Sequence, residues 1–149
     1  MVDTGARSRL SELIRQLVAG LITNDQFEDR IPQSADPAIH EVYFSGIWGL
    51  YSDLYEYRLI GKDRVPREAR RVLARYILFL KSGLEYEWPR QSWWQFLLSF
   101  GAALLTLGLS NRWYCKAFSK AGDIDVWPFT RQRDFEVAVD RPPYLHGCA

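Results

Sequence analysis

Apolar residues near the start of the chain recur at steps of three and four. In residues 8–20 these positions are Leu10, Leu13, Ile14, Leu17 and Val18. This spacing places them on one face of an α-helix, and Gly20 stands where such a helix would end. Thr23 and Gln26 then have the spacing of a capping box, which predicts the start of a short second helix. We therefore expect residues 1–32 to form a helical hairpin.

The segment around this turn, LVAGLITNDQFEDR, has a second feature. Its order of residue types is carried by Gly20, Ile22, Thr23, Phe27 and Glu28. Over residues 11–31 the chain resembles the helical-hairpin module called SHOCT, in which an apolar helix precedes glycine, Ile-Thr, an acidic or amide pair and Phe-Glu. That family is usually found at chain ends as an oligomerisation or docking element, so the resemblance implies interaction rather than catalysis. This chain lacks the family's lysine-rich continuation after Glu28, and a capped hairpin of a kind used by many helical proteins is the alternative.

Helical periodicity returns in residues 36–82. Asp36 and Pro37 form an N-cap followed by proline at the first helical position. The face that follows runs as far as Gly61 and consists of Phe44, Ile47, Trp48, Tyr51, Leu54, Tyr55 and Arg58. Pro66 begins a further amphipathic segment that stops before Gly83. Because the predicted connection is short, we expect an antiparallel αα-hairpin.

The remaining segments are less regular. Residues 84–90 and 122–129 read as irregular or strand segments, because Pro89 disfavours helix at Trp88 and the second segment contains Gly122 and Pro128. A last short helix is expected from Thr130, within a C-terminal extension over residues 112–149. A chain of 149 residues has the size of one ordinary domain. The prediction is a mainly α, single-domain helical bundle over 1–149 with a central αα-hairpin.

One segment has no charge at all: residues 91–111, twenty-one residues in length. Its small and weakly polar side chains share one helical side, and Trp93 and Trp94 stand at its start. The length is near the ~20 residues that span a bilayer, and aromatic and basic residues lie at both borders. The seventeen-residue apolar stretch 93–109 contains glycine and polar residues, which favours a buried core helix or a self-association face. Membrane anchoring through residues 91–111 is the alternative.

Charge is balanced overall but uneven along the chain. The net charge is +1, yet residues 1–56 carry four basic and nine acidic side chains, and residues 57–90 carry nine and four. Segments of opposite sign are expected to pack together. On the αα-hairpin, Arg67, Arg71 and Arg75 form a stripe at four-residue spacing that faces Asp53 and Glu56. This arrangement favours a solvated or ion-paired face over a nucleic-acid site.

Catalytic and metal motifs are incomplete. His40-Glu41 resembles the start of a zinc-protease motif, but position 44 is Phe44 rather than histidine. The carboxylate pairs Asp123/Asp125 and Glu85/Glu87 have the spacing of ordinary turns. We therefore assign no catalytic, cofactor-binding or metal-binding residue, and infer no cofactor or small-molecule ligand. A small enzyme whose site joins these carboxylates with His40 is the lower alternative.

Aromatic and cysteine content indicate the kind of function. The chain has six Trp, eight Tyr and eight Phe, residue types that are enriched where proteins bind one another. Its two cysteines lie 33 residues apart with no CxxC motif, which favours free thiols in a reducing compartment and hence the cytoplasm. Beyond residues 11–31 the chain resembles small bacterial proteins, which implies a bacterial source and no particular activity. We predict a non-enzymatic interaction or regulatory protein that binds a protein partner or itself. The candidate interaction residues are Trp48, Tyr51, Tyr55, Trp93, Trp94, Arg67, Arg71 and Arg75.

Overall fold

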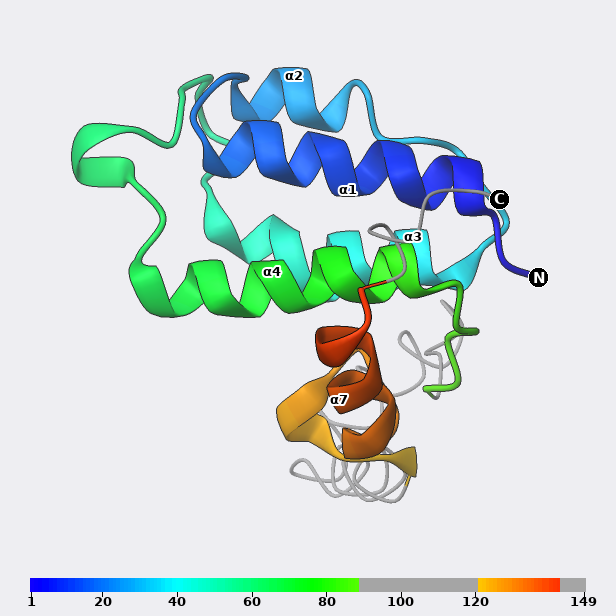
Figure 1. The fold of residues 1–149 in the computed structure, drawn as a ribbon. Coiled ribbons are helices and arrows are strands. Elements are labelled where there is room, and N and C mark those ends of the chain that lie inside the picture. Colours follow the sequence, from blue (N-terminus) through cyan, green and yellow to red (C-terminus); the bar gives the residue numbers. More distant parts are fainter. Residues whose placement is uncertain (89–120, 143–149) are drawn as a thin grey trace, which may run out of the picture.

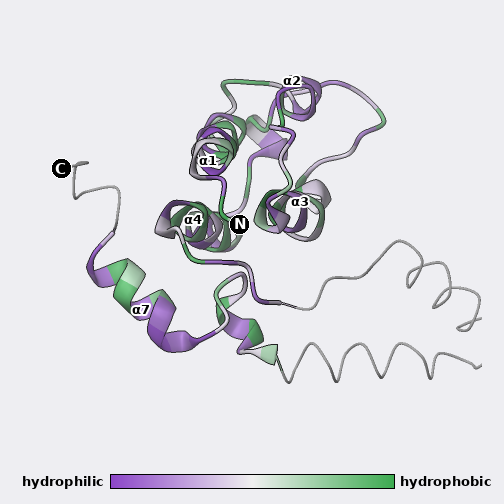
Figure 2. Ribbon diagram, turned by 90° about the vertical axis from the view of Figure 1, so that its right-hand side faces the viewer, coloured by the Kyte–Doolittle hydropathy of each residue, from purple (hydrophilic) through white to green (hydrophobic). Residues whose placement is uncertain are grey.

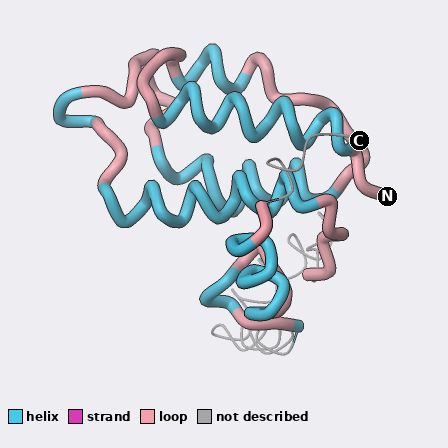
Figure 3. The backbone as a smooth tube through the Cα atoms, viewed as in Figure 1, coloured by secondary structure: helices cyan, strands magenta, loops and turns pink. Residues whose placement is uncertain are grey.

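Helical segments, among them five α-helices, make up most of the described part of the chain, with no strand among these residues (Figure 3). The computed structural model describes residues 1–88 and 121–142. The α-helices are α1 (Thr4–Val18), α2 (Asn24–Glu28), α3 (Pro37–Glu41), α4 (Arg67–Ser82) and α7 (Gln132–Asp140). The π-helical segment η1 (Val42–Ile47) and the 3₁₀ turns η2 (Trp48–Leu50), η3 (Gly61–Asp63) and η4 (Ile124–Val126) complete the regular structure. The mainly α fold class is confirmed.

Helices α1 and α2 form the predicted N-terminal hairpin. The carboxylate of Asp3 accepts a hydrogen bond from the Ala6 amide at 2.9 Å and starts α1. Gly20 has φ +70°, the left-handed conformation that glycine adopts most readily. In the capping box, the Gln26 amide donates to Thr23 Oγ1 at 3.1 Å, and the Thr23 amide donates to Gln26 Oε1 at 3.3 Å. The left-handed glycine therefore ends α1, and the capping box fixes the start of α2.

The core lies where α1 and α4 pack antiparallel, with α3 and η1 alongside α4 (Figure 1). Figure 2 looks along these axes and shows α1, α2, α3 and α4 grouped around one interior. Fully buried side chains on the facing helices include Leu10, Ile14, Leu17, Leu73, Phe79 and Leu80. These are the periodic apolar positions of the sequence, and burying each contributes roughly 1.5–3 kcal/mol. The predicted packing of oppositely charged segments finds no support in the contact between α1 and α4, because α1 carries three arginines against one glutamate and α4 is basic as well.

The prediction of one helix from Asp36 to Gly61 is wrong beyond Leu50. The helix begins as expected, because Asp36 Oδ1 accepts the Ala38 amide at 3.0 Å and Pro37 follows the cap. The backbone then widens into η1, tightens into η2 and becomes extended at Tyr51, with φ −140° and ψ 165°. The first arm of the hairpin is therefore about half as long as the apolar pattern suggests.

A buried asparagine explains where that helix stops. Asn24, 1% exposed, donates through Nδ2 to the carbonyls of Ser52 and Tyr55, both at 3.0 Å. Its Oδ1 accepts the Tyr57 amide at 2.8 Å, and its own amide donates to the Tyr57 carbonyl at 3.1 Å. These four bonds satisfy backbone groups that a helix would otherwise pair. Residues 51–66 consequently form a long loop instead of the short connection predicted around Gly61.

The antiparallel arrangement of the hairpin arms is nevertheless confirmed (Figure 1), as is the helix after Pro66. Helix α4 ends at Gly83 with φ +71°. Residues 84–88 are irregular, which confirms the irregular alternative there.

Residues 121–142, called the α7 unit below, pack beside the end of α4. Phe129 is fully buried and lies edge-on to Phe79 with ring centroids 5.2 Å apart. The Trp88 indole donates to the Pro128 carbonyl at 3.1 Å, and Trp127 contacts Tyr76 at 5.0 Å between centroids. Within 122–129 the chain forms turns and η4 rather than a strand. Aromatic contacts thus fasten the α7 unit to the body formed by residues 1–88.

The uncharged segment 91–111, with Trp93 and Trp94, lies outside the described residues, so the choice between core helix and membrane anchor stays a prediction. None of the helices in 1–88 or 121–142 combines the length and apolar character that a membrane crossing requires.

Candidate interaction surfaces

The most buried charges of the described residues belong to the interior and not to a site. Arg7 and Asp36 are 1% and 3% exposed. Arg7 donates from Nε to Asp36 Oδ2 at 2.6 Å, from Nη2 to Oδ1 at 3.1 Å, and from Nη1 to the Leu84 carbonyl at 2.6 Å. Asp36 also accepts the Asp3 amide at 2.9 Å. The pair ties the starts of α1 and α3 to the end of α4.

The environment of Asp36 favours its charged form. Burial raises the pKa of this carboxyl group, but hydrogen bonds from Arg7 and from two backbone amides more than offset burial. The pKa therefore lies below its ordinary value of 3.8. With every strong partner in place, this pair has the character of a structural connection.

A different group of side chains is exposed or partly exposed along α3, η1 and η2. We call His40, Tyr43, Phe44 and Trp48 the aromatic row. His40 stacks on Phe44 at 4.8 Å between ring centroids, and Phe44 lies 5.3 Å from Trp48. Tyr43 contacts Phe44 edge-on at 5.4 Å. Phe44 and Trp48 are 49% and 45% exposed, so two large apolar rings present about half of their surface to water.

The row rests on a close packing of its backbone against α4. A Cβ added to Gly46 would lie 2.6 Å from Cε2 of Tyr76, so only glycine permits this approach without displacing the ring. Tyr76 is 7% exposed and held edge-on by Trp127. On the inner side of the row, Tyr43 contacts the buried ring of Phe27 at 6.3 Å. The backbone and the inner ring of the aromatic row are therefore packed against the interior, which holds the exposed rings of Phe44 and Trp48 in position.

The other two predicted aromatic residues lie elsewhere. Tyr51 is 9% exposed and its hydroxyl donates to Glu28 Oε1 at 2.9 Å. Burial and the hydrogen bond to Glu28 raise the pKa of the Tyr51 hydroxyl. Tyr55 is 60% exposed in the loop and contacts Tyr57 at 4.9 Å. Tyr51 thus belongs to the interior, and Tyr55 is exposed but separate from the row.

The predicted arginine stripe is split between solvent and the α7 unit. Arg67 and Arg71 are exposed, whereas Arg75 is half-buried and its guanidinium donates to the Asp125 carbonyl. Across residues 1–88 and 121–142, no ion pair links these arginines to Asp53 or Glu56. The expected neutralisation by that acidic pair is therefore not the arrangement that the described residues adopt.

Glu56, one of the two acids expected to face the arginine stripe, has another partner: its Oε1 accepts a hydrogen bond from the Thr23 hydroxyl at 2.7 Å. Arg71 and Arg75 instead line a cavity of about 270 Å³ whose other walls include Phe135 and Val139 of α7.

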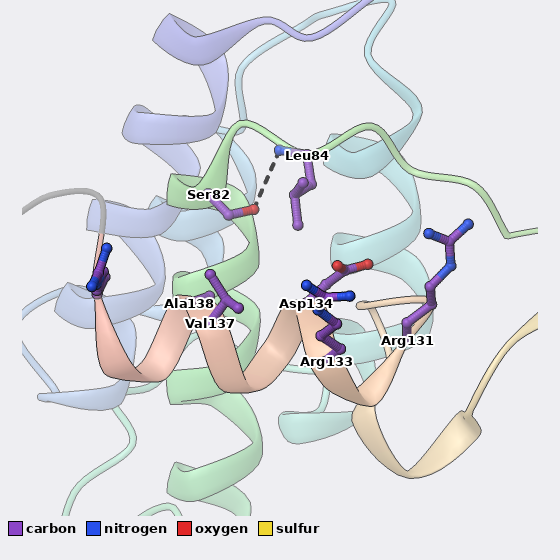
Figure 4. A pocket seen from close by; sticks show the side chains of 8 residues that line it. Ser82, Leu84, Arg131, Arg133, Asp134, Val137 and Ala138 are labelled. Carbon is purple, nitrogen blue, oxygen red and sulfur yellow. Dashed lines mark hydrogen bonds between the residues drawn. The ribbon is translucent and has the colours of Figure 1, made fainter.

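A larger groove of about 560 Å³ lies between the end of α4 and α7 (Figure 4). We call it the α7 groove, and it is lined by Ser82, Leu84, Arg131, Arg133, Asp134, Val137, Ala138 and Arg141. Figure 4 shows Leu84 pointing toward α7 from one side and Val137 pointing back from the other. The sequence interpretation missed this groove because the acids of residues 121–142 outnumber the arginines there, and only the fold brings the three arginines together with just one of the acids, Asp134, in its lining.

The carboxylate pairs do not converge. Asp123 Oδ1 accepts the Asp125 amide at 3.0 Å and so stabilises the turn at η4. Glu85 lies 3.4 Å from the N-terminal amine, whereas the His40 ring stacks on Phe44. In the part of the chain that the structure describes, no three His, Cys, Asp or Glu side chains are grouped to hold a metal.

Comparison with known proteins gives no further guide: no protein-family model, curated protein or solved structure matches the chain significantly.

Proposed function

We propose that this protein is a non-enzymatic interaction or regulatory protein of the bacterial cytoplasm, and that it binds a protein partner through the aromatic row. The observation that carries the proposal is the pair of half-exposed rings, Phe44 and Trp48, in contact with each other and with His40. Isolated apolar side chains on a surface are common, but a contiguous group of large ones marks an interaction site.

The chemistry of the row suits protein recognition. Trp and other aromatic side chains supply large contact areas and are enriched among the residues that dominate binding energy. Because Tyr43 and the backbone at Gly46 are packed against the interior, the row loses little freedom on binding. π-Helical segments such as η1 are rare and often occur at functional positions. The resemblance of residues 11–31 to a docking module supports the same class of function.

A matched pair of variants tests the proposal. Phe44→Ser/Trp48→Ser removes the half-exposed rings, and Tyr55→Ser removes a more exposed ring that lies in the loop outside the row. Both variants of the full chain are compared with the wild type by sedimentation velocity and by affinity capture. Any captured protein is purified and its binding is then measured directly by calorimetry.

The expected result is a loss of affinity of at least about tenfold for the double variant and no change for Tyr55→Ser. Self-association that disappears in the double variant alone would support the proposal equally. Unchanged association of the double variant, with its helical content retained by circular dichroism, would contradict the role of the row.

A further inference from the structure

We propose that the α7 groove binds an extended acidic segment of a partner protein, with acidic side chains at both ends of the segment and an apolar side chain between them. The proposal does not depend on the aromatic row, because the two surfaces share no residue and lie on different elements.

The charges that line the groove favour a negative ligand. Three guanidinium groups, those of Arg131, Arg133 and Arg141, stand against the single carboxylate of Asp134. None of these three arginines forms an ion pair with an acid among the described residues. Guanidinium groups bind carboxylates through paired hydrogen bonds, which gives such contacts direction as well as attraction.

The acids of α7 that could compensate these charges lie off the groove. Glu136 accepts a hydrogen bond from the Gln132 side chain at 3.0 Å, and neither Glu136 nor Asp140 lines the groove. Helix α7 also begins without a side-chain cap, so its first amides add to the positive potential near Arg131.

The positions of the arginines set the length of the ligand. Arg131 precedes the first residue of α7 and Arg141 follows the last, so ten residue steps separate them. At 1.5 Å per residue the separation along the helix is about 15 Å, which an extended peptide covers with about five residues. Between the two ends, Leu84, Val137 and Ala138 form the apolar part of the lining. An acidic–apolar–acidic order therefore matches the groove.

The openness of the groove favours a chain segment over a small anion. Arg131, Arg133, Val137 and Arg141 are all exposed, whereas sites for small molecules usually enclose most of their ligand. A polyanion such as nucleic acid is disfavoured, because the α7 unit as a whole carries five acids and three arginines. Local positive charge beside apolar side chains is the pattern that a short acidic motif complements.

The test uses the full chain and a fluorescein-labelled hexapeptide, Asp-Glu-Leu-Leu-Asp-Glu, in fluorescence polarisation at low salt. Two comparison peptides replace its acids by lysine or its leucines by serine. The protein variants are Arg131→Glu/Arg133→Glu, Val137→Asp and the control Arg67→Glu, which reverses an exposed charge outside the groove. Inorganic phosphate and citrate serve as small-anion competitors, and circular dichroism checks the fold of each variant.

We expect saturable binding of the acidic peptide, weakened at least about tenfold by either groove variant and unchanged by Arg67→Glu. The lysine peptide should not bind, and the serine peptide should bind more weakly than the leucine peptide. Absence of saturable binding up to about 1 mM overturns the proposal. It is also overturned if the serine peptide binds equally well, or if phosphate binds as tightly as the peptide, since the groove would then be a plain anion site. None of these outcomes affects the result expected for the Phe44→Ser/Trp48→Ser variant, so either proposal can fail while the other stands.

Discussion

Arginine occupies two opposite environments in this molecule. Arg7 is almost completely buried, and each of its three nitrogens donates to a protein acceptor. Arg131 and Arg133 of the α7 groove are exposed and form no ion pair within the described residues. The N–H donors of Arg7 are thus already used inside the fold, whereas those of Arg131 and Arg133 remain accessible to a ligand.

The difference shows how a structural charge is distinguished from a binding charge. A buried guanidinium must have its partners inside the fold, because an unpaired buried charge costs several kcal/mol, roughly 3–5. An exposed guanidinium is solvated, so the fold tolerates it without a partner and the group can exchange water for a ligand. Removing the carboxylate partner of Arg7 should therefore lower the free energy of unfolding far more than removing the exposed arginines Arg131 and Arg133.

The largest effect is expected from the interior pair. Asp36→Ala leaves Arg7 buried without its carboxylate and also removes the cap of α3. We expect the free energy of unfolding to fall by about 3–5 kcal/mol, measured by urea denaturation. Asp36→Asn, which keeps a capping oxygen, should lose less. A change in Asp36→Ala below about 1 kcal/mol would remove the distinction between the two environments.

A smaller effect is expected beneath the aromatic row. Gly46→Ala places a methyl group against the ring of Tyr76, which Trp127 holds in place. Overpacking of this kind typically costs about 1–3 kcal/mol, and urea denaturation measures it. Gly49→Ala is the control, because no atom lies within 4 Å of the added Cβ. Equal stability of both variants would contradict the close packing that supports the row.

Acid should weaken the interior pair in a defined direction. Asp36 has a lowered pKa in the folded state, so the unfolded chain binds its proton more readily. The stabilisation is present above the unfolded value of 3.8 and is lost as the pH falls through the folded value. For one group the slope stays below about 1.4 kcal/mol per pH unit. Urea midpoints measured from neutral to acid pH should fall less in Asp36→Asn, and parallel curves would show that Asp36 is not the titrating group.

The smallest effect is expected in the groove. Arg131→Ala/Arg133→Ala removes exposed side chains without ion-pair partners, so the free energy of unfolding should change by no more than about 0.5 kcal/mol. Thermal denaturation checks this expectation. A loss of about 2 kcal/mol or more would mean that these arginines stabilise the fold, which would undo the contrast with Arg7.

Local signals in the sequence predicted several elements correctly. The capping box at Thr23, the cap and proline at Asp36, and the left-handed glycines at 20 and 83 each act within a few residues, so their outcome depends little on the rest of the fold. Trp48 was named as a candidate interaction residue from its place in an aromatic series, and its role stays a prediction, although the structure leaves it 45% exposed. The aromatic series itself did not separate Trp48 from Tyr51, which the structure places in the interior.

Long-range contacts decided the remainder. The Asn24 side chain donates to the Ser52 carbonyl from nearly thirty positions earlier in the chain and so ends the helix. The residues near Ser52 in the sequence do not predict this hydrogen bond. The burial of Arg7 likewise depends on Asp36 and on the Leu84 carbonyl, which come from separate elements.

The sequence by itself therefore determined the helical class, the caps and the apolar faces, because these follow from the spacing of neighbouring residues. Only the tertiary structure decided which arginines are enclosed, where the aromatic row stops and that α7 forms a basic-edged groove with the end of α4. The physical reason is that burial and hydrogen-bond partners arise only when distant segments pack together. The sequence of one segment does not determine them.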